Sequence, residues 1–342
     1  MAASISEFVT KSWYRGAYWL YLLWPLYLVY RSVTFVRQCC YQMGVFKTYR
    51  AKTPVVVVGN ITLGGTGKSP LVAYLVESLT ALGLKPGVVS RGYGAQISTD
   101  EVREVNVNSL VSEVGDEPLM LKQRVGCPIF VSPTRALAVQ ALEKLGCDIV
   151  ITDDGLQHYA LARDLEICVF DGERMWGNGH LLPMGPMRES LKRIKSTDFV
   201  VVNGTGPEWP GPYVPNIASF NMTLEAGMLQ GLHNGNALPL SEFRAQKVEA
   251  IAGIGNPERF FQTLASEGLN VQAHHFSDHH VYTQSDVCFG NGRPLIMTEK
   301  DAVKCRTFNI ENAWYLPVSA KLSGDLATQI VKALHIKGWL NG

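Results

Sequence analysis

Short apolar runs alternate with amphipathic stretches along most of the chain from residue 53 onward. Runs rich in β-branched residues and bounded by turn signals are typical of strands buried on both faces of a parallel sheet. Six such runs come first, at 55–58, 85–90, 127–131, 147–152, 165–170 and 199–203. Helical patterns lie between several of them, notably over 70–82 and 134–145. This alternation predicts an α/β fold with a mainly parallel sheet and helices on both of its faces.

Residues 204–245 interrupt this pattern with clusters of Gly, Pro and Asn and two short strand-like pieces, 217–224 and 228–232. The alternation then resumes. Strands are expected at 248–253, 271–276, 295–298 and 314–318, and helices at 258–267 and 324–334. We therefore expect a second, smaller α/β unit. The expected parts are an N-terminal helix over 1–40, a core over 41–205, a connector over 206–247 that forms a small β ribbon, and a C-terminal domain over 248–342.

The start of the chain is apolar and aromatic. Residues 16–30 carry no charge, but they are fewer than the roughly 20 apolar residues that span a bilayer, and Pro25 interrupts them. Eight of the twenty Trp and Tyr residues lie between Trp13 and Tyr30, and these residue types favour the membrane–water interface. We expect a monotopic helix on the membrane surface. Two alternatives stay open: a signal peptide, and a helix buried by its own protein.

Composition and charge narrow the class of protein. The chain has 342 residues, of which 46% are hydrophobic and 18% charged, which excludes a disordered or fibrous chain and suits two domains. The net charge of +1 argues against a uniformly basic nucleic-acid binder. Residues 1–52 nevertheless hold seven Lys or Arg against Glu7, a net of +6, which indicates that this end meets an anionic surface. The seven cysteines have no C-x-x-C spacing and fit a reducing compartment.

The strongest chemical signal is the run Gly-Asn-Ile-Thr-Leu-Gly-Gly-Thr-Gly-Lys-Ser at 59–69, which follows a strand and opens a helix as a P-loop does. Glycines let backbone N–H groups converge on phosphate oxygens, Lys68 can reach the β- and γ-phosphates, and the Ser69 hydroxyl can ligate Mg²⁺. Thr62 stands where the pattern has Gly. The alternative is an ordinary Gly-rich turn. We expect a P-loop NTPase core in which ATP is held by Thr62, Leu63, Gly64, Gly65, Thr66, Gly67, Lys68 and Ser69.

Two pairs of acids follow. Asp153 and Asp154 end an apolar strand, where the Mg²⁺-side carboxylate of a P-loop protein stands, although Asp-Asp-Gly is also a common turn. Adjacent side chains of a regular strand point to opposite faces, so one of these acids should lie closer to the metal. Asp116 and Glu117 precede a proline in a tight loop. Such acids either cap a helix or supply a general base to a hydroxyl nucleophile.

Other clusters are more ambiguous. Four histidines and an aspartate lie between His274 and His280, but no Cys stands at ligand spacing, so a zinc site is not favoured. A histidine of this cluster can instead face a catalytic carboxylate. Arg91 follows a strand at the edge where open α/β sheets bind ligands, and Arg188 lies in a loop rich in Gly and Pro. Both arginines suit phosphate or carboxylate, and both can equally be solvated loop residues.

Together these motifs resemble the tetraacyldisaccharide 4′-kinase family of lipid A biosynthesis. The matching segments are G-N-I-T-L-G-G-T-G-K-S-P, S-R-G-Y-G, G-D-E-P, T-D-D-G-L-Q-H, G-N-G-H-L-L-P-M-G-P-M-R-E, F-S-D-H-H and T-E-K-D-A-V-K, after an aromatic N-terminal helix. The likeness runs from about residue 10 to 335. Each motif alone is weak, but their order and spacing together are specific. The family's loop commonly has Thr or Ser at the position of Thr62.

The resemblance implies transfer of the γ-phosphoryl group of ATP to the 4′-hydroxyl of tetraacyldisaccharide 1-phosphate, which gives lipid IVA, at the cytoplasmic face of a Gram-negative inner membrane. It implies ATP and Mg²⁺ as cofactors, a lipid disaccharide substrate, an anionic membrane surface as partner, and no nucleic acid. We also expect a monomer. The alternative is a membrane-associated P-loop ATPase or switch protein, but T-E-K-D at 298–301 lacks the Asn of the guanine-binding N-K-x-D motif.

The resemblance also implies roles for individual residues. Asp116 matches the proposed base and His279 its partner; His279 is preferred to His280 because it directly follows Asp278. Lys68 is the catalytic cation. The expected metal-side residues are Ser69, Asp153, Asp154 and Glu117, and the expected substrate residues are Arg91, Tyr93, His158 and Arg188.

Overall fold

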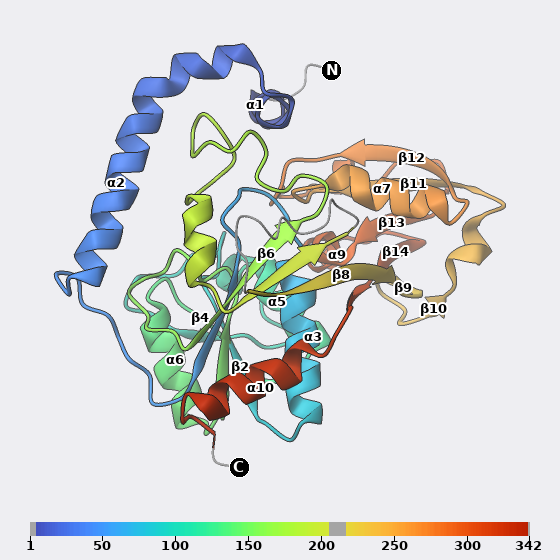
Figure 1. The fold of residues 1–342 in the computed structure, drawn as a ribbon. Coiled ribbons are helices and arrows are strands. Elements are labelled where there is room, and N and C mark those ends of the chain that lie inside the picture. The colour runs from blue at the N-terminus through green and yellow to red at the C-terminus, as the bar shows by residue number, and fades with distance from the viewer. Residues whose placement is uncertain (1–4, 205–216, 341–342) are drawn as a thin grey trace.

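In the computed structural model, which describes residues 5–204 and 217–340, the strands form two mixed, mainly parallel sheets (Figure 1). Within these residues the larger sheet has the order β15-β8-β7-β6-β1-β5-β2-β4-β3, and only its outermost strands, β15 and β3, are antiparallel to their neighbours. Its strands are β1 (Val55–Gly59), β2 (Pro86–Ser90), β3 (Arg103–Glu104), β4 (Ile129–Val131), β5 (Ile149–Thr152), β6 (Leu165–Asp171), β7 (Phe199–Asn203), β8 (Ala218–Ala226) and β15 (Val318–Leu322). The expected mainly parallel sheet is confirmed.

The valines of β1 explain why helices cover both faces of this sheet. Val56 and Val58 pack into one apolar cluster, and Val55 and Val57 into another on the opposite face, because side chains alternate along a strand. The first cluster is closed by α3 (Lys68–Ala81), α5 (Asp116–Arg124) and α10 (Leu326–Ile336), and the second by α6 (Arg135–Lys144). Two short helices, α4 (Val111–Val114) and η2 (Leu191–Ser196), complete the large unit.

The second sheet has the order β10-β9-β14-β13-β11-β12 among the described residues. Strands β14, β13, β11 and β12 are parallel, and β9 and β10 add antiparallel neighbours. These strands are β9 (Leu229–Gly231), β10 (Ala237–Leu238), β11 (Lys247–Ala252), β12 (Asn270–His275), β13 (Leu295–Thr298) and β14 (Ala313–Leu316). The accompanying helices are η3 (Leu240–Phe243), α7 (Pro257–Ser266), α8 (Gln284–Val287) and α9 (Glu299–Cys305).

The chain crosses between the sheets in a way that the sequence pattern did not indicate. The two strand-like pieces of the expected connector do not pair as a ribbon: β8 extends the large sheet beside β7, and β9 joins the second sheet. After β14 the chain returns to the large sheet as β15, followed by α10. Leu326 and Ile330 of α10 are fully buried in the apolar cluster that contains Val56 and Val58. The division at 206 and 248 stays a prediction, and residues 206–216 lie outside the described residues.

The N-terminal segment forms α1 (Ile5–Arg15), the 3₁₀ helix η1 (Tyr18–Leu23) and α2 (Trp24–Gln42) rather than one helix. Helix α2 stands at the side of the large unit (Figure 1), and none of its residues is buried. The alternative of a helix buried by its own protein is therefore wrong. In the part of the chain that the structure describes, no helix is both long enough and apolar enough to cross a membrane.

Candidate active site

One cavity of about 880 Å³ lies where the carboxyl ends of the parallel strands of both sheets face each other. The large sheet contributes the segments that follow β1, β2 and β5 and the last residues of β6 and β7, and the second sheet contributes the segments after β11, β12 and β13. Open α/β sheets bind ligands at this edge because the connecting loops and helix N-termini gather there. The topology thus brings residues from widely separated parts of the sequence to one place.

The P-loop enters the cavity from β1. Gly67 precedes α3 with a φ of 88°, a conformation that favours glycine, and a Cβ there would clash with the side-chain amide of Asn203. The Asn203 amide donates to the Thr66 carbonyl oxygen at 3.1 Å, which ties the loop to β7. Residues 63–69 line the cavity, as expected. Thr62 does not: it is 2% exposed and forms an isolated bridge with Met187.

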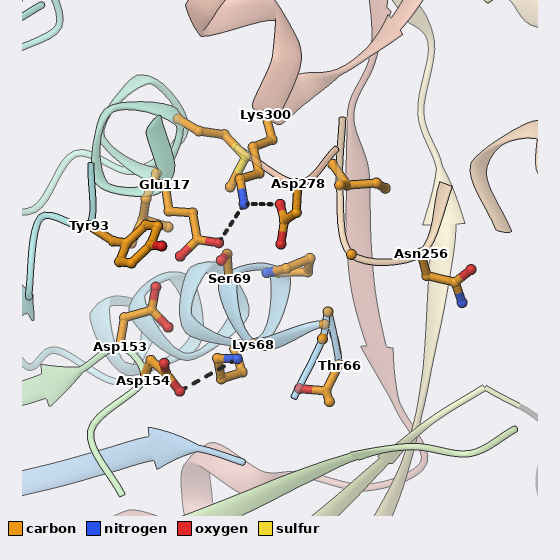
Figure 2. Close-up of a pocket in the computed structure, with 18 of the residues that line it drawn as sticks. Thr66, Lys68, Ser69, Tyr93, Glu117, Asp153, Asp154, Asn256, Asp278 and Lys300 are labelled. Carbon is orange, nitrogen blue, oxygen red and sulfur yellow. Dashed lines mark hydrogen bonds and ion pairs between the residues drawn. The ribbon is translucent and has the colours of Figure 1, made fainter. Parts of the chain in front are cut away.

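Asp153 and Asp154 both line the cavity (Figure 2), contrary to the expectation that a strand would turn them to opposite faces. The strand ends at Thr152, and Asp154 has a φ of 50°, so the alternation no longer holds. Asp154 Oδ1 lies 3.6 Å from Lys68 Nζ, and Oδ2 lies 3.0 Å from a guanidinium nitrogen of Arg188. Burial raises the pKa of Asp154, but these cations outweigh it and lower the pKa to about 2.

Asp153 has the opposite environment. It is buried, its Oδ1 has no hydrogen-bond partner among the described residues, and the carboxylate of Glu117 faces the same cavity. Burial, with the negative charge of Glu117 as the next contribution, raises the pKa of Asp153 to about 7. The two adjacent aspartates therefore differ: cations dominate the surroundings of Asp154, whereas at Asp153 burial and the charge of Glu117 outweigh the attraction of Lys68 and Arg135.

Asp116 and His279 come into contact although they are 163 positions apart in the sequence. His279 Nδ1 lies 2.9 Å from Asp116 Oδ2 and 3.2 Å from Oδ1. Burial is the largest single influence on both groups: it raises the pKa of Asp116 and lowers that of His279. Their hydrogen bond and nearby opposite charges together outweigh it, so the pKa of Asp116 is lowered and that of His279 raised. The ring of Tyr93 packs on that of His279, with centroids 4.6 Å apart. The N-cap of α5 is Gly115 rather than Asp116.

The other histidines of the cluster have separate partners. His280 Nε2 lies 3.3 Å from Asp286, and the Nε2 atoms of His274 and His275 lie 2.7 and 2.9 Å from Glu249 and Glu258, respectively. Among the described residues, no group of three or more His, Cys, Asp or Glu side chains is arranged to hold a metal ion. His279 is therefore the histidine of this cluster that faces Asp116.

The four residues expected to bind substrate, Arg91, Tyr93, His158 and Arg188, all line the cavity. Burial, followed by the charges of Arg135 and Arg163, lowers the pKa of His158 to about 3, so this ring is neutral near pH 7. A neutral imidazole can donate one hydrogen bond and accept another.

Comparison with known proteins gives the family. The family model for tetraacyldisaccharide-1-P 4′-kinase matches residues 19–335, most of the chain. The chain belongs to the tetraacyldisaccharide-1-P 4′-kinase family. The tetraacyldisaccharide 4′-kinase of Shewanella sp. (strain W3-18-1) is 46% identical over 330 residues, which cover 96% of this chain and 95% of that protein. That of Methylobacillus flagellatus is 42% identical over 336 residues and 98% of each chain.

A solved structure agrees. The crystal structure of LpxK from Aquifex aeolicus in complex with ATP matches with a TM-score of 0.75 and 28% identity, over 93% of this chain and 98% of that chain. Because the match covers 93% of this chain, it includes residues of both sheets.

Some residues that line the cavity or contact its lining were not predicted from the sequence. The guanidinium of Arg135, buried at the start of α6, donates to the carbonyl oxygens of Asp153 and Asp154 at 3.1 and 2.8 Å. Arg259, on α7, donates to Asn203 Oδ1 at 3.3 Å. Lys300 lines the cavity and belongs to the T-E-K-D-A-V-K motif, but the sequence predicts no role for this lysine. The sequence signal for all three was a basic residue in the first turn of a helix that follows a strand.

Proposed function

We propose that this chain transfers the γ-phosphoryl group of ATP to the 4′-hydroxyl of tetraacyldisaccharide 1-phosphate and so forms lipid IVA. Membership in the family supports this proposal. The observation that carries it is that the P-loop lines the same cavity as His279, whose imidazole contacts the buried carboxylate of Asp116. Phosphoryl transfer needs positioning and neutralisation of charge more than covalent catalysis, and this cavity offers both.

Each group has a role in this reaction. The backbone of residues 63–69 and the ammonium of Lys68 hold the phosphates of ATP. Asp116 accepts the proton of the acceptor hydroxyl, and His279 orients Asp116. Arg91 and Arg188 offer guanidinium groups to the anionic substrates, and Tyr93 and His158 line the same cavity. One chain supplies both walls of the cavity, which supports action as a monomer.

The residues present fit Mg²⁺. Asp153 Oδ1 is a buried carboxylate oxygen without a hydrogen-bond partner among the described residues, and Glu117 and Ser69 face it across the cavity (Figure 2). Mg²⁺ prefers oxygen ligands and uses only one or two carboxylates beside water and substrate phosphates, so a larger ligand cluster is not required. We propose that Asp153, Glu117 and the Ser69 hydroxyl hold the ion. When bound, it would neutralise charge on the β- and γ-phosphates.

Loss of the Asp153 carboxylate should weaken the binding of magnesium. We expect Asp153→Asn to raise the Mg²⁺ concentration for half-maximal activity at least about tenfold, as loss of metal-site residues does elsewhere. Mg²⁺ titrations of the wild type and the variant measure this. Asp148→Asn is the control, because Asp148 is exposed and accepts a hydrogen bond from the Lys85 backbone outside the cavity. Identical titration curves for Asp153→Asn and the wild type would remove Asp153 from the metal site.

We propose that the N-terminal helices attach the enzyme to the cytoplasmic face of the inner membrane. Large apolar side chains of this segment are exposed: Phe8, Tyr18, Tyr21, Leu22, Trp24, Leu26, Leu28, Val29, Val33, Phe35 and Val36. Such a patch on a protein surface marks a contact with a membrane or a partner, and the basic residues of the segment favour anionic lipid. Arg37 of α2 lines the cavity, and the Tyr30 hydroxyl donates to the Arg188 carbonyl oxygen at 3.1 Å. A lipid held at α2 would therefore lie next to the site.

Val29, Val33 and Val36 stand one turn apart on α2 and are 57–62% exposed. Since burial of one such side chain contributes about 1.5–3 kcal/mol, replacing all three with Ser should weaken binding to anionic vesicles at least about tenfold. The KM for the lipid should rise while that for ATP stays near normal. Vesicle sedimentation and steady-state kinetics measure these effects. A double variant, Leu82→Ser with Leu145→Ser, removes exposed leucines elsewhere and should bind vesicles normally. Undiminished sedimentation of the triple variant would refute this attachment surface.

The dependence of ATP consumption on the acceptor tests the proposed reaction class. A kinase should turn over ATP rapidly only with tetraacyldisaccharide 1-phosphate present, because the acceptor hydroxyl completes the reacting arrangement. An ATPase or switch would release phosphate at the same rate without the lipid. Phosphate release and ADP formation, measured with and without the acceptor, distinguish these functions.

A further inference from the structure

Lys300 lies at the junction of the two units, beside the Asp116–His279 pair, and has no role in the mechanism described above. Its ammonium nitrogen lies 2.9 Å from Glu117 Oε1, 3.1 Å from Asp278 Oδ1 and 3.3 Å from His279 Nε2 (Figure 2 shows the first two contacts). An ammonium group has three N–H donors and no acceptor. These three contacts can therefore use all of its donors. The cation of the phosphate-binding loop is a different residue, Lys68.

The position of Lys300 is set by the start of α9. Thr298 is the N-cap, and its Oγ1 accepts from the Asp301 backbone N–H at 3.1 Å. The Asp301 carboxylate is fully buried and accepts from the Gly253 backbone N–H at 2.9 Å and from the Thr298 hydroxyl at 2.7 Å. These bonds fasten the first turn of α9 to the loop after β11. Lys300 thus projects from a fixed turn rather than from a free loop.

Lys300 contacts two adjacent residues of the loop after β12, Asp278 and His279. His279 has a φ of 59°, an uncommon conformation for a residue other than glycine, so its backbone needs support from neighbouring groups. Asp278 Oδ1 accepts from the His279 backbone N–H at 3.1 Å and also from Lys300. Lys300 therefore stabilises the loop through Asp278 and the imidazole ring through Nε2.

The contact with Nε2 also determines where the ring proton lies. Because an ammonium can only donate, the neutral ring must accept at Nε2 and carry its proton on Nδ1. The Nδ1–H then points to Asp116 Oδ2, 2.9 Å away. We propose that Lys300 is a positioning residue that fixes the rotamer and the tautomer of His279, so that His279 donates to Asp116 and orients it. This inference rests on the proposed role of Asp116 as the base.

A double-mutant cycle tests the proposal in the full-length enzyme. Lys300→Met should lower kcat about 10²-fold, within the range for loss of a catalytic proton-transfer arrangement, with the KM for ATP changed by less than about threefold. If Lys300 acts through His279, Lys300→Met with His279→Ala should be no more than about twofold slower than His279→Ala alone. Lys300→Arg, which keeps a cationic donor, should recover a large part of the loss. Lys332→Met, which replaces an exposed lysine of α10 outside the cavity, should retain kcat.

Three results would overturn the proposal: losses that multiply in the double variant, a tenfold higher KM for ATP with normal kcat in Lys300→Met, or an equal loss in Lys332→Met. If Lys300→Met does not fold, as judged by its thermal melting curve, the same cycle with Lys300→Gln decides. Failure of the proposed function is separate, since it would appear as absence of lipid phosphorylation by the wild type or as full activity of Asp116→Asn.

Discussion

Replacing Asp116 with Asn should lower kcat by about 10²–10⁴ while ATP binding stays near normal. The amide keeps the size of the side chain but cannot take the proton of the acceptor hydroxyl. Asp116 sits outside the P-loop, and no described contact joins it to residues 63–69, so nucleotide affinity should not depend on it. Single-turnover kinetics at saturating ATP, with nucleotide binding measured separately, give both quantities.

His279 should act with Asp116 as one unit. Removing both side chains should then cost little more than removing the more important one, because coupled residues are not additive. His280→Ala is the matched control: this neighbouring histidine faces Asp286 instead of Asp116. Strict additivity of Asp116→Ala and His279→Ala would break the proposed pair, and a larger loss in His280→Ala would mean that the wrong histidine had been assigned.

Loss of the P-loop cation should be at least as severe. Lys68→Ala removes the ammonium expected to neutralise charge on the β- and γ-phosphates in the transition state. Removal of a single stabilising donor of this kind costs about 2.7–4 kcal/mol, or 10²–10³ in rate, and Lys68→Ala should reach at least that. In the structure Lys68 Nζ contacts Asn60 Oδ1 at 3.3 Å and Asp154 at 3.6 Å, so its position is already defined before phosphate binds.

The test of Lys68 is kcat/KM for ATP at saturating lipid. Lys85→Ala serves as the control, because Lys85 is an exposed lysine just before β2 and does not line the cavity. Turnover by Lys68→Ala at the wild-type rate would refute the assignment of this loop to nucleotide binding.

The central part of the fold could be predicted because its signals are local. The valines of β1 form an uninterrupted apolar run, and burial on both faces requires such a run. The course of β8 could not be predicted in this way, since its largely exposed residues suit a ribbon as well as an outer strand of a sheet. The return of β15 and α10 to the first sheet depends on contacts between residues far apart in the sequence, such as Val318 opposite Ala226. No local pattern records such contacts.

In the site, too, local features could be predicted from the sequence, whereas contacts between distant residues could not. The P-loop is a contiguous segment, and its geometry follows from its sequence. The pairing of Asp116 with His279 was predicted from the resemblance to a family, because the two residues are 163 positions apart in the sequence. The period of two along a strand misled us at Asp154, where a positive φ turns the side chain into the cavity. The surroundings of Lys300 depend on the packing of α9 against α5, so only the folded structure reveals them.

The fate of the γ-phosphoryl group tests the central claim most directly. The purified chain is incubated with Mg²⁺, ATP labelled in the γ-phosphate and tetraacyldisaccharide 1-phosphate, and the lipid product is isolated and analysed by NMR. We predict that the label enters the lipid at the 4′-oxygen, and that an acceptor whose 4′-hydroxyl is blocked remains unlabelled. Label that appears only in inorganic phosphate, or at another hydroxyl of the disaccharide, would contradict the account.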